Sequence, residues 1–228
     1  MRPLTQSLLL IPPHEHIIPL YDVFLPPQTH ELHIVFECME GNLYQLTKTR
    51  RGRPLAQGLV ASILQQVLEG LHHVHSHGFF HRDLKPENLL FRDRSEHSDL
   101  LIADFGLSRM VDDDKMTVLS TTCGTPGYMA PEIFRKTGHG KPVDMWAIGV
   151  ITYFLLCGYT PFDRDSSAEE MQAIVNADYK FEPEIYWRDV SDEARDFIRR
   201  LLTIDQNERM TATQALQHPW IRHAGRTE

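Results

Sequence analysis

The sequence predicts an α+β protein with a small front part that contains strands and a larger rear part that is mainly helical. Apolar residues at 17–25 and 32–36 come in short runs typical of strands, and the second run alternates. Short apolar pieces separate polar loops at 79–127, and helical spacing returns behind them. We therefore expect a front part of residues 1–40, a rear part of residues 41–222 and a tail of residues 223–228.

The helices are predicted from apolar spacing and from the residues that begin them. Between residues 55 and 74 apolar side chains recur at helical spacing, which predicts one long amphipathic helix that ends at Gly78. Short strands are expected at 89–91 and 100–103. Two pairs have the spacing of capping boxes and one serine is a candidate N-cap: Ser166 with Glu169, Thr211 with Gln214, and Ser191.

Composition narrows the classes of function. The net charge is −8, from 31 acidic and 23 basic residues, which argues against general binding to nucleic acids or to anionic membranes. The longest apolar stretch, 145–159, is shorter than the ~20 residues that span a bilayer, so a buried helix is expected there. Three cysteines without metal-like spacing are typical of a reducing compartment. We expect a cytoplasmic or nuclear protein, or one found in both.

The loop-rich middle carries the residues for phosphoryl transfer. This reaction needs metal ions at the phosphates and a carboxylate that orients the attacking hydroxyl. The eight residues His81-Arg82-Asp83-Leu84-Lys85-Pro86-Glu87-Asn88 match the catalytic loop of protein kinases. Asp-Phe-Gly at 104–106 and Ala-Pro-Glu at 130–132 follow in the expected order.

With these three motifs the chain resembles the eukaryotic-type serine/threonine protein kinases, from about residue 8 to residue 221. The resemblance implies a bilobal protein kinase fold with a mainly helical C-lobe. It also implies transfer of the γ-phosphate of ATP to serine or threonine hydroxyls of protein substrates, with Mg²⁺ as the second cofactor. An inert scaffold in which these polar residues only cap turns is the structural alternative.

The resemblance also implies a role for each residue of the catalytic loop. Asp83 would orient the substrate hydroxyl and accept its proton, and Lys85 would contact the transferred phosphate. Asn88 and Asp104 would hold Mg²⁺. Thr125 resembles the threonine that hydrogen-bonds back to the catalytic aspartate and lysine.

Five further residues are expected around the adenine of ATP. The segment 36–39 resembles the hinge, where the backbone of Glu37 and Met39 would bind the adenine edge and Phe36 would be the gatekeeper. Leu90 and Ala103 would pack beneath the base. Read from the sequence alone, apolar residues at such positions are more often part of the core.

Regulatory and structural residues follow from the same resemblance. Thr121 lies where related kinases carry an activating phosphothreonine, and Arg82 would pair with that phosphate, although a solvated polar loop explains Thr121 equally well. Asp144 resembles the buried aspartate that anchors the catalytic loop. Glu132 and Arg209 resemble a structural ion pair.

The sequence departs from the family pattern in its front part. The first glycine is Gly41, so no Gly-x-Gly-x-x-Gly precedes the hinge, and Arg2 is the only Lys or Arg before Lys48. We therefore expect a truncated N-lobe, with residues 1–40 as its remnant. The alternative functions are a catalytically impaired, pseudokinase-like binding module and a fragment.

Two subfamilies are resembled by different parts of the chain. Residues 11–46 resemble the male-germ-cell-associated and meiosis-inducing kinases, whereas residues from about Arg92 onward resemble calcium/calmodulin-dependent kinases. Natural drift, an error in gene assembly and an engineered fusion all fit such a join. Protein substrates and an upstream activating kinase are the expected partners. Calmodulin is not an expected partner of this chain, because only 222–228 follow the last predicted helix.

Overall fold

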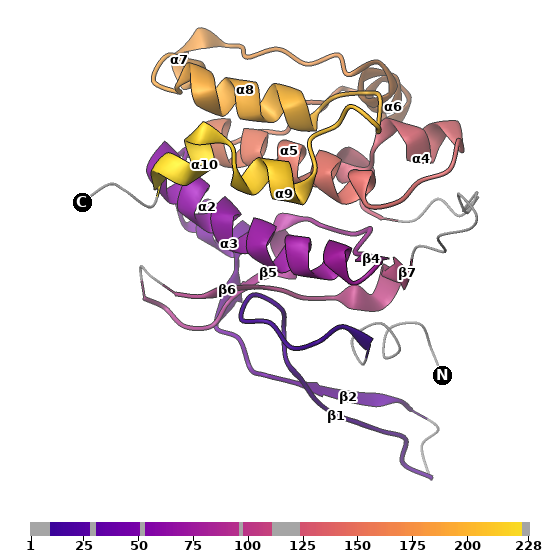
Figure 1. The fold of residues 1–228 in the computed structure, drawn as a ribbon. Coiled ribbons are helices and arrows are strands. Elements are labelled where there is room, and N and C mark those ends of the chain that lie inside the picture. The colour runs from indigo at the N-terminus through magenta and orange to yellow at the C-terminus, as the bar shows by residue number, and fades with distance from the viewer. Residues whose placement is uncertain (1–9, 28–30, 51–52, 96–97, 111–123, 225–228) are drawn as a thin grey trace.

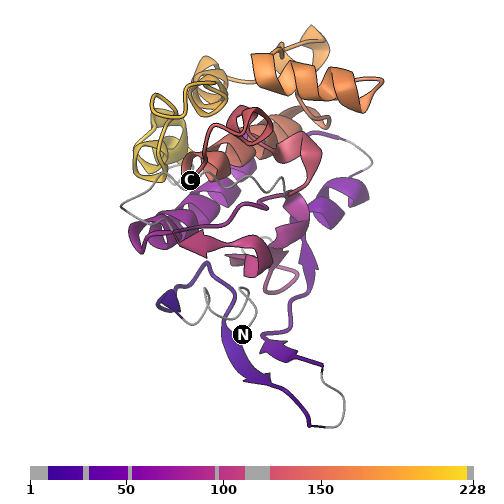
Figure 2. The same ribbon diagram turned by 90° about the vertical axis from the view of Figure 1, so that its right-hand side faces the viewer.

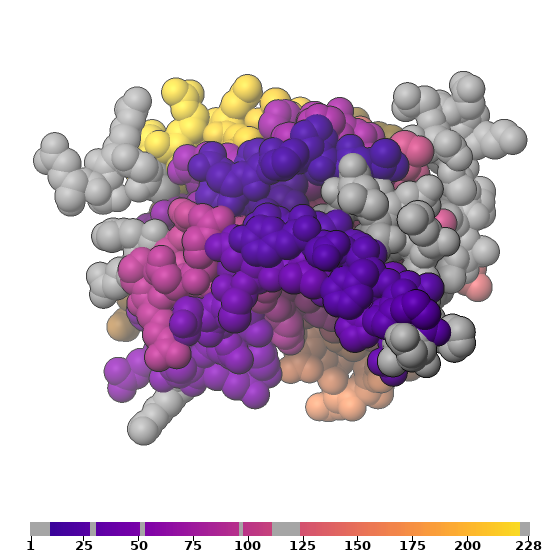
Figure 3. All heavy atoms as spheres, turned by 90° about the horizontal axis from the view of Figure 1, so that it is seen from below, coloured from indigo at the N-terminus to yellow at the C-terminus, as the bar shows by residue number. Residues whose placement is uncertain are grey.

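A computed structural model describes residues 10–27, 31–50, 53–95, 98–110 and 124–224 of the chain. The α+β prediction is confirmed: small sheets lie beside a mainly helical body (Figure 1). A hairpin formed near the N-terminus extends away from that body, most clearly in the turned view (Figure 2). Seen from below, N-terminal residues in indigo form much of the outer face (Figure 3).

The strands pair locally in antiparallel ladders. The hairpin pairs β1 with β2, a three-stranded sheet has the order β3-β5-β6, and β4 pairs with β7. Each ladder is short, so the strands position loops more than they build the core. The bounds are β1 Leu20–Phe24, β2 His33–Phe36, β3 Gly41–Asn42, β4 Phe79–Phe80, β5 Leu89–Phe91, β6 Leu100–Ile102 and β7 Arg109–Met110.

The helices account for most of the buried apolar surface. Helix α5 is buried along nearly its whole length, which confirms a core helix in place of a membrane span. No helix among the described residues is both long and apolar enough to cross a membrane. The bounds are α2 Leu43–Thr49, α3 Gln57–Ser76, α4 Pro131–Arg135, α5 Pro142–Cys157, α6 Ser167–Asn176, α7 Glu184–Trp187, α8 Asp192–Leu201, α9 Ala212–Leu216 and α10 Pro219–Ala224.

Most predicted helix starts have the expected caps. Thr211 and Gln214 form a complete capping box, and the Ser191 side chain accepts a hydrogen bond from the backbone of Ala194. Ser166 caps α6 through the backbone N–H of Glu169. Helix α2 was not predicted, although Asn42 and Gln45 form a capping box that was present in the sequence.

The segment ahead of β1 is anchored to the helical body. The predicted strand 17–25 begins only at residue 20, because Ile17 makes an isolated parallel bridge to Ile102 of β6 instead. The backbone of Ile102 donates to the carbonyl of His16 at 2.9 Å. That carbonyl lies so close to Gly70 of α3 that an added methyl group would come within 2.8 Å of it. The segment ahead of β1 and helix α3 are therefore in direct contact at His16 and Gly70.

Candidate active site

The catalytic loop is fixed from below by a buried carboxylate. Asp144, in the first turn of α5, accepts hydrogen bonds from the backbone N–H groups of His81 and Arg82, each at 2.8 Å. The His75 ring donates a third at 2.8 Å. Burial alone would raise the pKa of Asp144, but the hydrogen bonds and the nearby histidines outweigh it and lower the pKa. The anchoring role predicted for Asp144 is consistent with this geometry.

These bonds hold a backbone that would not form unaided. Arg82 has φ of 77°, in the left-handed region that residues other than glycine adopt only when their surroundings require it. Next to it, the buried His81 ring accepts from the N–H of Asp83 at 3.2 Å and donates to the carbonyl of Ala103 at 2.8 Å. The loop and the strand β6 that leads to Asp104 are thereby tied together.

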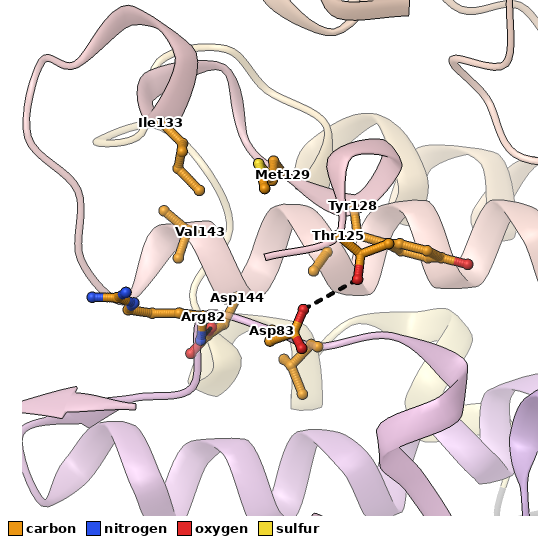
Figure 4. Close-up of a pocket in the computed structure, with 10 residues that line it drawn as sticks. Arg82, Asp83, Thr125, Tyr128, Met129, Ile133, Val143 and Asp144 are labelled. Atoms are coloured by element: carbon orange, nitrogen blue, oxygen red, sulfur yellow. Dashed lines mark hydrogen bonds between the residues drawn. The ribbon is translucent and has the colours of Figure 1, made fainter. Parts of the chain in front are cut away.

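Four predicted catalytic residues converge on one point. The Thr125 hydroxyl lies 3.3 Å from Oδ1 of Asp83, and Nζ of Lys85 lies 3.0 Å from both Oδ2 of Asp83 and the Thr125 hydroxyl. Asn88 donates to the carbonyl of Asp83 at 2.8 Å. In Figure 4 the Asp83 carboxylate points toward Thr125, whereas the Arg82 side chain points away from it. The arrangement leaves a carboxylate with a fixed orientation beside an ammonium group.

Behind Asp83 lies a small cavity between the catalytic loop and the helical body. Thr125 and Asp83 border its polar side, and Met129, Ile133 and Val143 border its apolar side (Figure 4). Its volume is about 10 Å³, room for about one water molecule. The packing behind the catalytic loop is therefore nearly complete, which limits movement of Asp83.

Asp104 stands at the start of a short 3-10 helix, η2 (Phe105–Leu107). Its φ of 59° is also left-handed, and its carboxylate accepts from the N–H of Gly106 at 3.2 Å. Phe105 is fully buried and packs edge-on against His81, with 4.9 Å between ring centroids. Asp104 remains exposed. A buried anchor thus presents an exposed carboxylate, the ligand type that Mg²⁺ prefers.

All five residues predicted around adenine line a single cleft of about 640 Å³. Phe36, the last residue of β2, and Met39, which follows that strand, border it together with Leu90, Ala103 and Asp104. The Glu37 side chain is turned to Arg92, with 3.1 Å between Oε1 and Nε. The Glu37 carboxylate is therefore paired with Arg92. The contact predicted for adenine involves the Glu37 backbone and not this carboxylate.

The cleft has further lining residues that the sequence analysis did not name. Ile34 lies two positions before Phe36, so both point to the same face of β2. That alternation was visible in the sequence. Ile18 and the segment 40–42 join the lining only because the chain folds back, for which the sequence held no local signal.

The predicted structural ion pair is present. Arg209 and Glu132 form two parallel hydrogen bonds, of 2.7 and 3.0 Å, and both side chains are buried. The guanidinium also donates to the carbonyls of Thr203 and Pro142 and lies over the Trp146 ring. Nearly every donor of this buried cation is therefore used.

Two predictions meet limits in the structure. Thr121 lies outside the described residues, so the structure says nothing of its pairing with Arg82. Among the described residues, no group of three or more His, Cys, Asp and Glu side chains forms a metal site. Asn88 and Asp104 alone would suit an ion that takes its other ligands from phosphate and water, as Mg²⁺ commonly does.

The cleft and the side chains around it are suited to ATP with Mg²⁺. Asp104 is among the residues that line an apolar cleft of adequate volume, and Asn88 and Asp104 carry side-chain oxygens that would suit Mg²⁺. The carbonyl of Ala103, in the cleft, is hydrogen-bonded to His81 of the catalytic loop, whose Asp83 is held by Lys85 and Thr125. The apolar cleft and the charged catalytic loop are therefore directly linked.

Comparisons with known proteins agree with this arrangement. The family model described as Protein kinase domain matches residues 5–221. Calcium/calmodulin-dependent protein kinase cmkB of Emericella nidulans is 54% identical over 209 residues, 91% of this chain and 51% of that protein. The type I enzyme of Schizosaccharomyces pombe is 48% identical over 83% of this chain and 60% of its own length.

A third relative, myosin light chain kinase A of Dictyostelium discoideum, is 42% identical over 92% of this chain and 69% of its own length. The chain thus spans about half to two thirds of these curated relatives. The family match covers the catalytic loop, the cleft and the helical body alike. The chain belongs to the protein kinase domain family.

Proposed function

We propose that this chain transfers the γ-phosphoryl group of ATP to serine or threonine hydroxyls of proteins. The observation that carries the proposal is the convergence of Thr125 with Asp83 and Lys85 of the catalytic loop. Through His81 this loop is hydrogen-bonded to Ala103, which lines the cleft of the predicted adenine residues. Lys85, two residues after the aspartate, supports serine and threonine as acceptors. Kinase relatives at 54% and 48% identity support the same reaction class.

The chain's own residues would act by positioning and by charge. ATP would supply the phosphoryl group, and bound Mg²⁺ would neutralise part of the negative charge of its phosphates. Asp83 accepts the hydroxyl proton and aims the hydroxyl oxygen, and Thr125 and Lys85 keep its carboxylate in place. Lys85 also offers positive charge to the transferred group. Asn88 and Asp104 would hold the metal ion.

The test is incorporation of phosphate into a generic basic protein by the purified chain. Asp83→Asn keeps the size of the side chain and removes the base, so it should abolish incorporation. Asp165→Asn makes the same change on an exposed loop residue and should leave incorporation unchanged. Equal incorporation by the parent and Asp83→Asn would refute the proposal.

A binding module without turnover is the second candidate. It is favoured by one observation, that residues 1–47 contain no lysine and no glycine-rich loop to hold phosphates. ATP binding measured with and without Mg²⁺ separates the two functions. Mg²⁺-dependent binding combined with zero Asp83-dependent incorporation supports the module.

Regulation and specificity are further parts of the proposal. Phosphate on Thr121, added by an upstream kinase, would pair with Arg82. Thr121→Ala should then lower incorporation while ATP affinity stays nearly unchanged.

The segment Gly124–Tyr128 lacks an arginine ahead of Ala-Pro-Glu, so we propose that proline after the target residue is not required. A peptide array dominated by Ser-Pro and Thr-Pro sites would contradict this.

The subfamily of the front part, the response to calmodulin and the location in the cell are proposals that rest on the sequence alone. We propose that residues 11–46 resemble the male-germ-cell-associated and meiosis-inducing kinases. Sequencing of the transcript across the join near Arg92 would separate natural drift from an error in gene assembly or an engineered fusion. Two relatives are named as calmodulin-dependent, whereas we expect incorporation by residues 1–228 to be insensitive to calcium and calmodulin. Cytoplasmic or nuclear location, or both, is tested by imaging a tagged chain.

A further inference from the structure

The cleft lined by the predicted adenine residues is formed by three segments of the chain. The segment 36–39 borders it at the end of β2, Leu90 borders it from β5, and Ala103 borders it directly after β6. Strands β5 and β6 are paired in one ladder, to which the segment 36–39 does not belong. The cleft therefore keeps its shape only if that segment is fixed against the ladder.

Arg92, the residue after β5, is placed to fix it. Its Nε lies 3.1 Å from Oε1 of Glu37, and its Nη1 lies 2.6 Å from Oδ2 of Asp99. Asp99 directly precedes β6, and its carbonyl accepts from the backbone N–H of Arg92 at 3.0 Å. One guanidinium at the end of β5 thus joins the segment 36–39 to the start of β6.

The contact uses the fork of donors that is particular to arginine. Two nitrogens of one rigid plane donate to two different carboxylates, which a single ammonium group cannot do in the same geometry. The Glu37 side chain is 25% exposed and that of Arg92 is 36% exposed. Because both side chains are partly buried, water and salt screen their attraction less than that of a surface pair.

A second ion pair between neighbouring residues gives a natural comparison. Nε of Arg94 lies 2.8 Å from Oε2 of Glu40, but the Arg94 side chain is 86% exposed. A pair so exposed contributes little to the position of the backbone. Among the residues that the structure describes, neither Arg92 nor Arg94 lines the cleft. The two arginines therefore differ in burial and in the number of carboxylates that they contact.

We propose that Arg92 is a positioning residue for the base of ATP. Through Glu37 it holds the backbone of the segment 36–39 in register with Leu90 and Ala103, so that the cleft is shaped before the base enters. Pre-shaping of a site strengthens binding because less order has to be imposed when the ligand binds. This inference rests on the proposed function, since it concerns the same nucleotide site.

The experiment uses adenosine as the probe. Adenosine has the base without phosphates, so loss of a positive charge cannot weaken its binding through lost attraction to phosphate. In NMR titrations of the purified chain, Arg92→Met should weaken adenosine binding about fivefold, the upper range for a partly exposed ion pair. Arg94→Met, the matched control, should change it less than about twofold. Arg92→Lys should recover part of the affinity, since an ammonium group can still pair with Glu37.

Glu37→Gln tests whether Arg92 acts through Glu37. This change keeps the backbone that is predicted to contact adenine and removes only the ion pair. It should weaken adenosine binding in the parent and have no further effect in Arg92→Met, because the pair is already lost there. The inference is overturned if Arg92→Met or Glu37→Gln binds adenosine as the parent does, or if their effects add. It is also overturned if Arg94→Met loses as much affinity, or if the parent binds no adenosine.

Initial rates of phosphate incorporation separate this inference from the proposed function. Arg92→Met should raise the KM for ATP about fivefold and leave kcat nearly unchanged, because Arg92 is separate from the cluster of Asp83, Lys85 and Thr125. Adenosine binding that depends on Arg92 without any incorporation refutes the proposed function and leaves the inference standing. Incorporation with the same KM for ATP and the same adenosine affinity in the parent and Arg92→Met refutes the inference alone.

Discussion

The Asp144 carboxylate accepts a hydrogen bond from the backbone N–H of His81 at 2.8 Å, across 63 residues of sequence. Its other oxygen accepts from Arg82, the residue with a left-handed backbone. One buried side chain in the helical core thus determines the shape of the loop that carries Asp83. Stability of the core and geometry of the site are therefore linked through Asp144.

Asp144→Asn should lower the free energy of unfolding by about 3–5 kcal/mol, because an NH2 group would replace one acceptor oxygen and face a buried N–H donor, and the buried negative charge would be lost. The measurement is urea unfolding followed by tryptophan fluorescence. Asp165→Asn, which makes the same change at an exposed residue, should alter stability by less than about 0.5 kcal/mol. Similar midpoints for the two variants would contradict the anchoring role.

The buried pair of Arg209 and Glu132 should behave as one unit. Glu132→Gln or Arg209→Met alone leaves a buried charge without its partner and should cost about 3–5 kcal/mol. The double variant should cost clearly less than the sum of the two, because neither charge remains. Urea unfolding of the four proteins gives the coupling energy. Additive losses would show that the two side chains act independently.

Much of the site could be predicted because its residues are local in sequence. Asp83, Lys85 and Asn88 lie within six positions, so the motif carries their relative placement. The five predicted adenine residues come from three separate segments, and the structure brings them to one cleft. Their register against the catalytic loop, taken from the resemblance, was the information that local patterns lacked.

The features that the sequence did not predict depend mainly on contacts between segments that are distant in the sequence. Ile17 has strand-like neighbours, yet it makes a lone bridge to Ile102 because the chain there crosses α3 at Gly70. Helix α2 has only one fully buried residue, Leu43, so its apolar spacing is weak. Glu170 of α6 and Gly127 of the 3-10 helix Pro126–Tyr128 lie close together only because these two distant segments pack side by side. Contacts of this kind leave no periodic pattern and no motif in the sequence from which they could be predicted.

Histidines near the front segment predict a dependence of stability on pH. Burial, then the rings of His73 and His16, lowers the pKa of His14, while Glu15 and Glu69 act in the opposite direction. The His14 and His73 rings are 4.7 Å apart, and His73 and His77 are 4.4 Å apart. Because the unfolded chain binds this proton more readily, His14 should favour folding above about pH 6.5 and lose that contribution as the pH falls.

His14→Asn should therefore make the free energy of unfolding less dependent on pH between pH 7 and 5. Asparagine can still accept the hydrogen bond that the His16 N–H donates to the His14 ring. The control is His33→Asn, in the exposed hairpin, which should keep the parent's pH dependence. Urea unfolding at each pH provides the values. Parallel curves for the parent and His14→Asn would rule out this contribution.

The last prediction concerns rate. Residues 1–47 contain neither a lysine nor a glycine-rich loop, so the polypeptide of residues 1–228 has no such groups to hold the phosphates of ATP. Loss of one preorganised charge contact typically costs ~10²–10³-fold in rate, and two such devices are lacking here. Initial rates on a generic basic protein should therefore lie well below the ~1–100 s⁻¹ typical of protein kinases.

Asp83→Asn provides the blank for that measurement, since a slow rate has meaning only above it. A small rate that Asp83→Asn abolishes would agree with the retained cluster of Asp83, Lys85 and Thr125 acting without phosphate-holding groups. Turnover within the usual kinase range would contradict the prediction. It would mean that the carboxylates Asp83 and Asp104, with Lys85, position ATP well enough without a strand lysine.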